Sequence, residues 1–76
     1  MIYYLIRLYT GKVGDYLYRE TENHLEFYSV EEKVFRRSIF HNIQAYLLEY
    51  EGKAKIMFQG TEKEYNKFMM AKELMK

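Results

Sequence analysis

The sequence contains no cysteine, no proline and no tryptophan among its 76 residues, and it has four glycines. Without cysteine the chain can form neither a disulfide nor a thiolate metal site, which suits a reducing cytosol better than secretion. No apolar run approaches the roughly 20 residues of a membrane-spanning helix, and the run from Ile2 to Ile6 lacks the flanks of a signal peptide. We therefore expect a cytoplasmic protein without a membrane segment.

An excess of charge of one sign is also missing. Twelve Lys and Arg residues stand against eleven Asp and Glu residues, which gives a formal net charge of +1. This balance is too even for a protein that holds nucleic acid mainly by counterion release. The apolar content of 49% is too high for a disordered tail, so we expect one folded domain over residues 1–76.

Motifs for catalysis and metal binding are absent from the sequence. Asp15 is the one aspartate, and Ser29, Ser38, His24 and His41 belong to no recognised nucleophile or base motif. The two histidines lack the closely spaced partners of a zinc site, so we expect them at a turn or a helix end. The sequence predicts a non-catalytic protein with no cofactor and no metal.

Aromatic residues are abundant, with nine tyrosines and five phenylalanines. Tyrosine buries a large ring while its hydroxyl stays wet, which suits interfaces. A core of this size supplies about 3–5 kcal/mol, and small proteins often add a disulfide, a metal or a partner. The same residue usage is also expected of an AT-rich genome, such as that of a low-GC bacterium or its phages.

The first part of the chain predicts three strands, because apolar and aromatic residues alternate with a period of two. Their approximate ranges are 2–9, 16–21 and 24–29. A tight turn between the second and third strands would place Arg19 opposite Glu26 and Tyr18 opposite Phe27. An ion pair and an aromatic pair would then favour this register.

The segment Gly11-Lys12-Val13-Gly14 resembles the GXXG loop with which KH domains clamp a nucleic-acid backbone. In that family the loop joins two helices, whereas predicted strands flank it here. We therefore expect a hairpin turn.

Residues 30–43 fit two interpretations, of which we favour a helix. Ser29 and Glu32 match a capping box. Apolar residues recur at every fourth position, at Phe35, Ile39 and Ile43. The β-branched and aromatic residues of the segment also suit a strand, which stays open as the alternative.

A hairpin is predicted over residues 46–58, with Tyr46 opposite Ile56 and Gly52 in the left-handed position of its loop. A second capping box, Thr61 to Glu64, opens a C-terminal helix at about 62–75. The predicted fold class is α+β, a mostly antiparallel five-stranded sheet with two helices in the order β-β-β-α-β-β-α. Six strands plus one C-terminal helix is the alternative.

An apolar surface follows from this arrangement if both helices cover the same face of the sheet. The other face would then present Tyr3, Leu5, Tyr9, Leu17, Tyr28, Leu47 and Met57. Monomers seldom leave such a patch in water, although helices on both faces would hide it. Met70 and Leu74 lie off the main apolar stripe of the C-terminal helix and could form a docking ridge. We predict a protein interface at Tyr3, Leu5, Tyr9, Tyr28, Met70 and Leu74.

The leading hypothesis is a small regulator or inhibitor that docks onto a protein partner or a second copy of itself. A phage or mobile element is one source of such a protein. The alternative is a nucleic-acid binder that uses one side of the middle helix, at Lys33, Arg36, Arg37 and Phe40. A third interpretation, a small-molecule or nucleotide sensor in a Tyr-lined cleft, has no motif to support it.

Overall fold

The computed structural model describes residues 1–74, with side chains as far as Glu73. Its elements are β1 (Ile2–Leu8), β2 (Gly14–Glu20), β3 (Leu25–Ser29), β4 (Val34–Arg37), α1 (Ile43–Glu49), β5 (Ala54–Gly60) and α2 (Glu62–Leu74). The strands form one antiparallel sheet in the order β4-β3-β2-β1-β5. The predicted α+β class, with five strands and two helices, is confirmed. No helix within residues 1–74 is long and apolar enough to cross a membrane.

The predicted register between the second and third strands is confirmed. Tyr18 lies opposite Phe27 and Arg19 lies opposite Glu26 across β2 and β3. The Arg19 Nε atom lies 2.5 Å from a Glu26 carboxylate oxygen. The β1–β2 connection is the expected hairpin turn, in which Gly11 has a φ of 65°. Local alternation and turn chemistry were sufficient to predict this part of the sheet.

The predicted helix over residues 30–43 is wrong, because residues 34–37 form β4. The Glu32 N–H donates to the Ser29 hydroxyl at 3.2 Å, as the capping box requires. Lys33 then adopts a φ of 60° and its N–H donates to the Ser29 carbonyl at 2.7 Å, which turns the chain back along β3. The expected capping contact therefore closes a hairpin instead of starting a helix.

The first arm of the predicted hairpin over residues 46–58 is also wrong, because its residues lie in α1. The Asn42 side chain accepts from the Ala45 N–H at 2.9 Å, and the Glu20 carboxylate accepts from the Ile43 N–H at 2.8 Å. These bonds satisfy two of the amides that a helix leaves open at its N-terminus. Ile56, expected opposite Tyr46, pairs with Ile6 of β1 instead.

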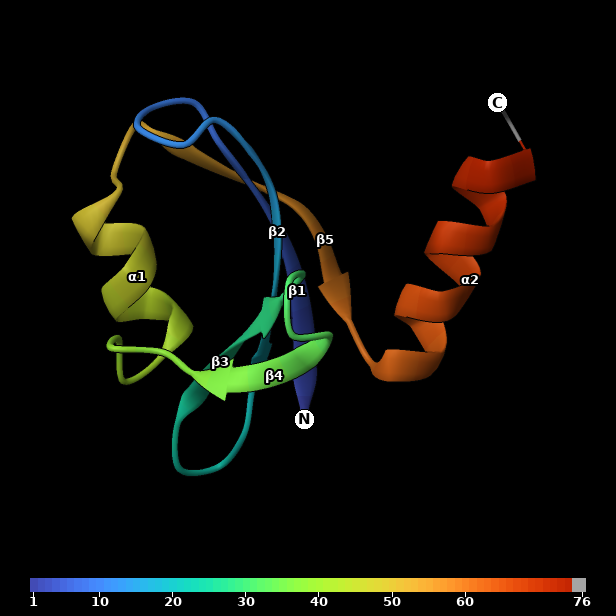
Figure 1. Ribbon diagram of the computed structural model, residues 1–76, viewed down its shortest axis with the longest axis horizontal. Helices are drawn as coiled ribbons and strands as arrows, with labels where there is room; N and C mark the ends of the chain where they lie inside the picture. Colours follow the sequence, from blue (N-terminus) through green and yellow to red (C-terminus); the bar gives the residue numbers. More distant parts are fainter. Residues whose placement is uncertain (75–76) are drawn as a thin grey trace.

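The two helices lie on opposite sides of the sheet (Figure 1). Successive residues of β1 point to opposite faces, which we call the α1 face and the α2 face. The main core lies on the α1 face and consists of Tyr4, Ile6, Leu8, Leu25, Ile43 and Tyr46. Of the two arrangements considered from the sequence, the helices therefore adopt the one that covers both faces.

The α2 helix begins at the predicted capping box. The Glu64 N–H donates to the Thr61 hydroxyl at 3.2 Å, and the Thr61 N–H donates to the Glu64 carboxylate at 3.0 Å. The helix packs mainly on β5 and β1, where the Phe68 and Phe58 rings stack at 4.9 Å. It crosses one side of the sheet and leaves much of β2, β3 and β4 uncovered on the α2 face.

An irregularity in β5 directs Phe58 toward α2. Ile56 pairs with Ile6 and Phe58 pairs with Leu5, so that Met57 is an extra residue on the β5 side. Without this bulge the alternation of the strand would return Phe58 to the same face as Ile56. The bulge therefore supplies the aromatic ring on which α2 packs.

Candidate functional site

An apolar groove of about 330 Å³ lies on the α2 face, between α2 and the uncovered part of the sheet. We call it the α2 groove. Its main apolar side chains are Leu5, Leu17, Tyr28, Val30, Tyr65 and Met69. Val30 is 77% exposed, which is unusual for a residue of its type. The groove therefore brings together the aromatic sheet face and the C-terminal helix.

The charged side chains of the α2 groove are of opposite sign. Asp15 and Lys72 both line it. The Arg7 Nε atom lies 2.7 Å from the Asp15 carboxylate, and this hydrogen bond lowers the pKa of Asp15, with a further contribution from Lys72. Arg7 therefore neutralises Asp15, Lys72 adds one positive charge, and the apolar wall remains the main feature of the groove.

A row of aromatic rings continues from α2 across the α2 face of the sheet. The Tyr65 ring stacks on Tyr3 at 5.9 Å, Tyr3 meets Phe35 edge to face at 6.0 Å, and Phe35 meets Tyr28 at 5.3 Å. The Arg19 guanidinium lies 3.8 Å from the Phe35 ring centroid. Edge-to-face pairs and a cation over a ring restrict these side chains, so the row forms a firm platform beside the groove.

The predicted interface residues fall into different environments. Tyr28 lines the groove, and Met70 is 63% exposed. Tyr3 and Leu5, expected on an open face, are only 6% and 7% exposed; Leu5 lines the groove, and Tyr3 lies in the aromatic row beside it. Tyr9 is exposed and lies outside the groove. The side chain of Leu74 lies outside the described residues.

Three residues that line the groove are absent from the predicted interface. Tyr65 and Met69 belong to the apolar side of α2 that packs on the sheet, and both also line the opening. Val30 was placed inside the middle helix, whereas it follows β3 in the turn to β4. A strand interpretation of residues 34–37 would have located Val30 at that turn.

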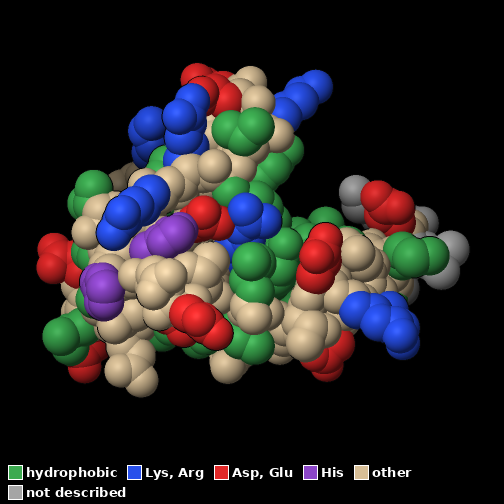
Figure 2. Space-filling model, turned by 90° about the horizontal axis from the view of Figure 1, so that it is seen from below, with side chains coloured by type: hydrophobic (Ala, Val, Ile, Leu, Met, Phe, Trp, Pro, Cys, Tyr) green, Lys and Arg blue, Asp and Glu red, His purple; other side chains and the backbone are tan. Residues whose placement is uncertain are grey.

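The four residues of the nucleic-acid alternative do not share a helix face, because no helix forms there. Arg36 and Arg37 follow each other in β4 and point to opposite faces of the sheet. Arg36 is paired with Glu32, Lys33 lies in the preceding turn, and Phe40 packs against Tyr46 at 5.3 Å. Acidic side chains also stand among the basic ones on the surface (Figure 2). This geometry gives phosphate groups no continuous basic track.

The histidines border a separate polar pocket of about 370 Å³. His41 is exposed before α1, and the His24 Nε2 atom lies 2.9 Å from the Glu26 carboxylate. Hydrogen bonds from His24 and Arg19 lower the pKa of Glu26. Within residues 1–74, no cluster of three or more His, Cys, Asp or Glu residues could hold a metal ion.

Comparison with known proteins finds no matching family model, curated protein or solved structure.

Proposed function

We propose that this protein is a small non-catalytic interaction module, a regulator or inhibitor that docks its α2 groove onto a protein partner. The observation that carries the proposal is the half-covered α2 face, where an apolar groove adjoins a platform of packed aromatic rings. Apolar surface of this kind is costly in water, and in monomers it commonly marks a contact with another protein.

The composition of the groove supports a protein as the partner. Its wall is aliphatic and aromatic, and Met69 contributes an adaptable side chain of the type found at binding surfaces. Because Arg7 neutralises Asp15, Lys72 is the one remaining charge among the described residues of the groove, which is too little to select a phosphate chain. We expect the partner to insert apolar side chains from a helix or a strand.

The compartment and source form part of the same proposal. The absence of cysteine suits a reducing environment, so we propose that the module acts in the cytoplasm. The residue usage fits an AT-rich genome. We propose a phage or another mobile element as the source of the gene.

A pull-down from the native host, read by mass spectrometry, tests the proposal. Val30→Glu and Met69→Glu place a charge in the groove, and we expect each to reduce partner recovery at least tenfold, since a buried unpaired charge costs several kcal/mol. Leu48→Glu is the matched control, because Leu48 is 74% exposed on α1, on the other side of the sheet.

The result contradicts the proposal if the groove variants and the Leu48 variant behave alike. Sedimentation equilibrium of the purified protein distinguishes a second copy of this chain from a different protein as the partner. A dimer that both groove variants dissociate would identify a second copy as the occupant. A monomer at all concentrations, together with no partner in the pull-down, would also contradict it.

The nucleic-acid alternative has its own test. Labelled single-stranded RNA is titrated at two salt concentrations with the wild type and with Arg36→Ala plus Arg37→Ala. We expect weak binding that the double substitution leaves unchanged, because the two side chains point to opposite faces. Tight, salt-sensitive binding that the substitution abolishes would favour the alternative.

A further inference from the structure

A second cleft, of about 460 Å³, opens on the α1 face beneath the loop between β1 and β2. Most of its wall comes from Leu8, Gly11, Lys12, Tyr16, Tyr18 and Tyr50. We call it the tyrosine cleft. Its size falls in the range of about 300–1,000 Å³ that is typical of small-molecule sites. Of its lining residues Tyr16 alone also lines the α2 groove, so the inference drawn for the cleft does not rest on the proposed function.

A fourth tyrosine lies behind the wall of the cleft. Tyr46 is 1% exposed, and its ring centroid lies 4.6 Å from that of Tyr18 and 4.9 Å from that of Tyr50. Its hydroxyl is buried and forms no hydrogen bond of ordinary geometry with the described residues. Burial raises the pKa of Tyr46 above the usual value, and a side-chain interaction with the Tyr18 hydroxyl raises it further.

Tyr46 lies directly behind the wall of the cleft. Its ring packs against those of Tyr18 and Tyr50, and both of these residues line the cleft. Most buried hydroxyls in native proteins have a partner, so an orphaned one beside a cleft needs an explanation. A polar atom of a bound ligand would supply the missing hydrogen bond once the Tyr50 ring moves aside.

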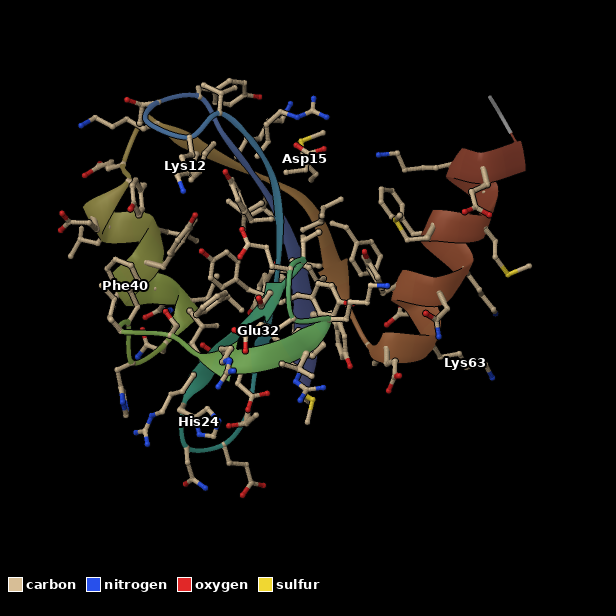
Figure 3. All side chains as sticks on the ribbon, viewed as in Figure 1. Lys12, Asp15, His24, Glu32, Phe40 and Lys63 are labelled. Atoms are coloured by element: carbon tan, nitrogen blue, oxygen red, sulfur yellow. The ribbon has the colours of Figure 1, made fainter. Side chains whose placement is uncertain are left out.

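The charge of the cleft comes from Lys12. Among the described residues that line it, no other side chain carries a formal charge. Lys12 lies in the loop above the space between α1 and the sheet (Figure 3). The Tyr16 hydroxyl donates to the Lys12 carbonyl at 2.7 Å, which fixes this part of the loop over the cleft. A cation at the mouth favours a negatively charged ligand and disfavours a cationic one.

We propose that the tyrosine cleft binds a small molecule that combines a flat aromatic ring with a negatively charged group. The ring stacks against the tyrosines, the anionic group pairs with Lys12, and a polar atom of the ring bonds to the Tyr46 hydroxyl. Tyrosine faces favour aromatic rings, and the ammonium group of lysine is a strong donor to carboxylate or phosphate. Nucleotides and aromatic carboxylic acids share this chemistry.

The test is an NMR titration of the full-length, nitrogen-15-labelled protein with three probes. Adenosine 5′-monophosphate and indole-3-acetate carry a ring and a charge, and adenosine is the uncharged control for the nucleotide. We expect amide shifts in residues 8–18 and 46–50, with at least one anionic probe binding. For the nucleotide pair, we expect about tenfold tighter binding of the monophosphate than of adenosine.

Matched variants separate the roles of the charge and the hydroxyl. Lys12→Gln should abolish the preference for the anion, whereas Lys53→Gln, which removes a charge outside the cleft, should retain it. Tyr46→Phe should weaken binding of the anionic probe severalfold without lowering the melting temperature. The thermal measurement shows that this variant is folded, which distinguishes lost binding from lost structure.

Four results would overturn the proposal: no shift with any probe at millimolar concentration, shifts confined to the α2 groove, equal effects of the Lys12 and Lys53 variants, or unchanged affinity in Tyr46→Phe. Binding of the monophosphate alone would identify nucleotides as the ligand source, and binding of indole-3-acetate alone would identify aromatic acids.

Discussion

The two faces of the sheet are covered by helices of very different length, and the shorter helix covers its face better. Helix α1 has seven residues and buries Ile43 and Tyr46 almost completely. Helix α2 has 13 residues, yet Tyr65, Phe68 and Met69 are only partly buried. The length of a helix therefore does not determine how closely it seals a sheet.

The difference follows from how each helix is attached. Helix α1 is connected to a strand at both ends, and the Glu20 carboxylate of β2 bonds to its first turn. Helix α2 is connected to the sheet at its N-terminus, through Gly60 and the Thr61 capping box. The first arrangement gives a closed core, while the second leaves a groove along one side of the helix.

The largest expected effect is the loss of a core ring on the α1 face. Tyr46→Ala should lower the free energy of unfolding by about 3–5 kcal/mol, because it removes a fully buried ring and leaves a cavity. Met69→Ala on the α2 face should cost far less. Urea denaturation of both variants measures the contrast, and similar losses would show that the two faces contribute equally.

A smaller effect is expected where α2 leaves the sheet. A Cβ atom at Gly60 would lie 2.9 Å from the Phe58 ring and 3.1 Å from a Glu64 carboxylate oxygen. Gly60→Ala should therefore lower the free energy of unfolding by about 1–3 kcal/mol and loosen the docking of α2. Hydrogen exchange should show faster exchange in residues 65–73 and unchanged protection in α1. Uniformly faster exchange would contradict a local effect.

The helix caps provide a matched pair of substitutions. Asn42→Ala and Thr61→Ala each remove one capping side chain, at a cost of about 1 kcal/mol. We expect the first to lower global stability and the second mainly to increase fraying of α2, because α1 is part of the closed core. Global unfolding and amide exchange measured together decide this, and equal global losses would remove the distinction.

The smallest effect concerns acid stability on the α2 face. Because bonds from His24 and Arg19 lower the pKa of Glu26 in the folded protein, ionised Glu26 contributes stability above its unfolded pKa of about 4.3. That contribution is lost as the pH falls through the lower, folded pKa.

Glu26→Gln should therefore flatten the dependence of melting temperature on pH over roughly pH 2–5. Glu31→Gln is the control, because Glu31 is exposed in the β3–β4 turn. Identical pH profiles for the wild type and Glu26→Gln would show that the Arg19–Glu26 pair has no net effect.

Local sequence signals predicted the elements whose hydrogen bonds close within a few residues. The hairpins of β1 to β3, the Arg19–Glu26 register and the Thr61 capping box all depend on near neighbours, and all are confirmed. The Asn42 cap of α1 was also readable, since an Asn precedes apolar residues at positions 43, 46, 47 and 50. The alternation of apolar and polar residues from Tyr46 to Ile56 favoured a hairpin over this helix.

For the candidate sites, the sequence indicated which residue types are abundant but not where their side chains lie. Tyr3 and Leu5 are buried instead of open to solvent. Arg36 and Arg37 point to opposite faces of the sheet instead of sharing one side of a helix. A residue list cannot reveal whether α2 covers β1 or leaves it open, because that depends on the packing of segments distant in sequence.

The sequence by itself determined the fold class, the first two hairpins and the start of the last helix, since each depends on alternation or capping between neighbouring residues. Tertiary structure decided which of the locally possible structures residues 30–49 adopt. The Ser29–Glu32 contact serves a turn as well as a helix, so pairing with β3 selected the strand. The Glu20 carboxylate, 23 residues away, helped to fix α1, and the bulge at Met57 gave α2 its face.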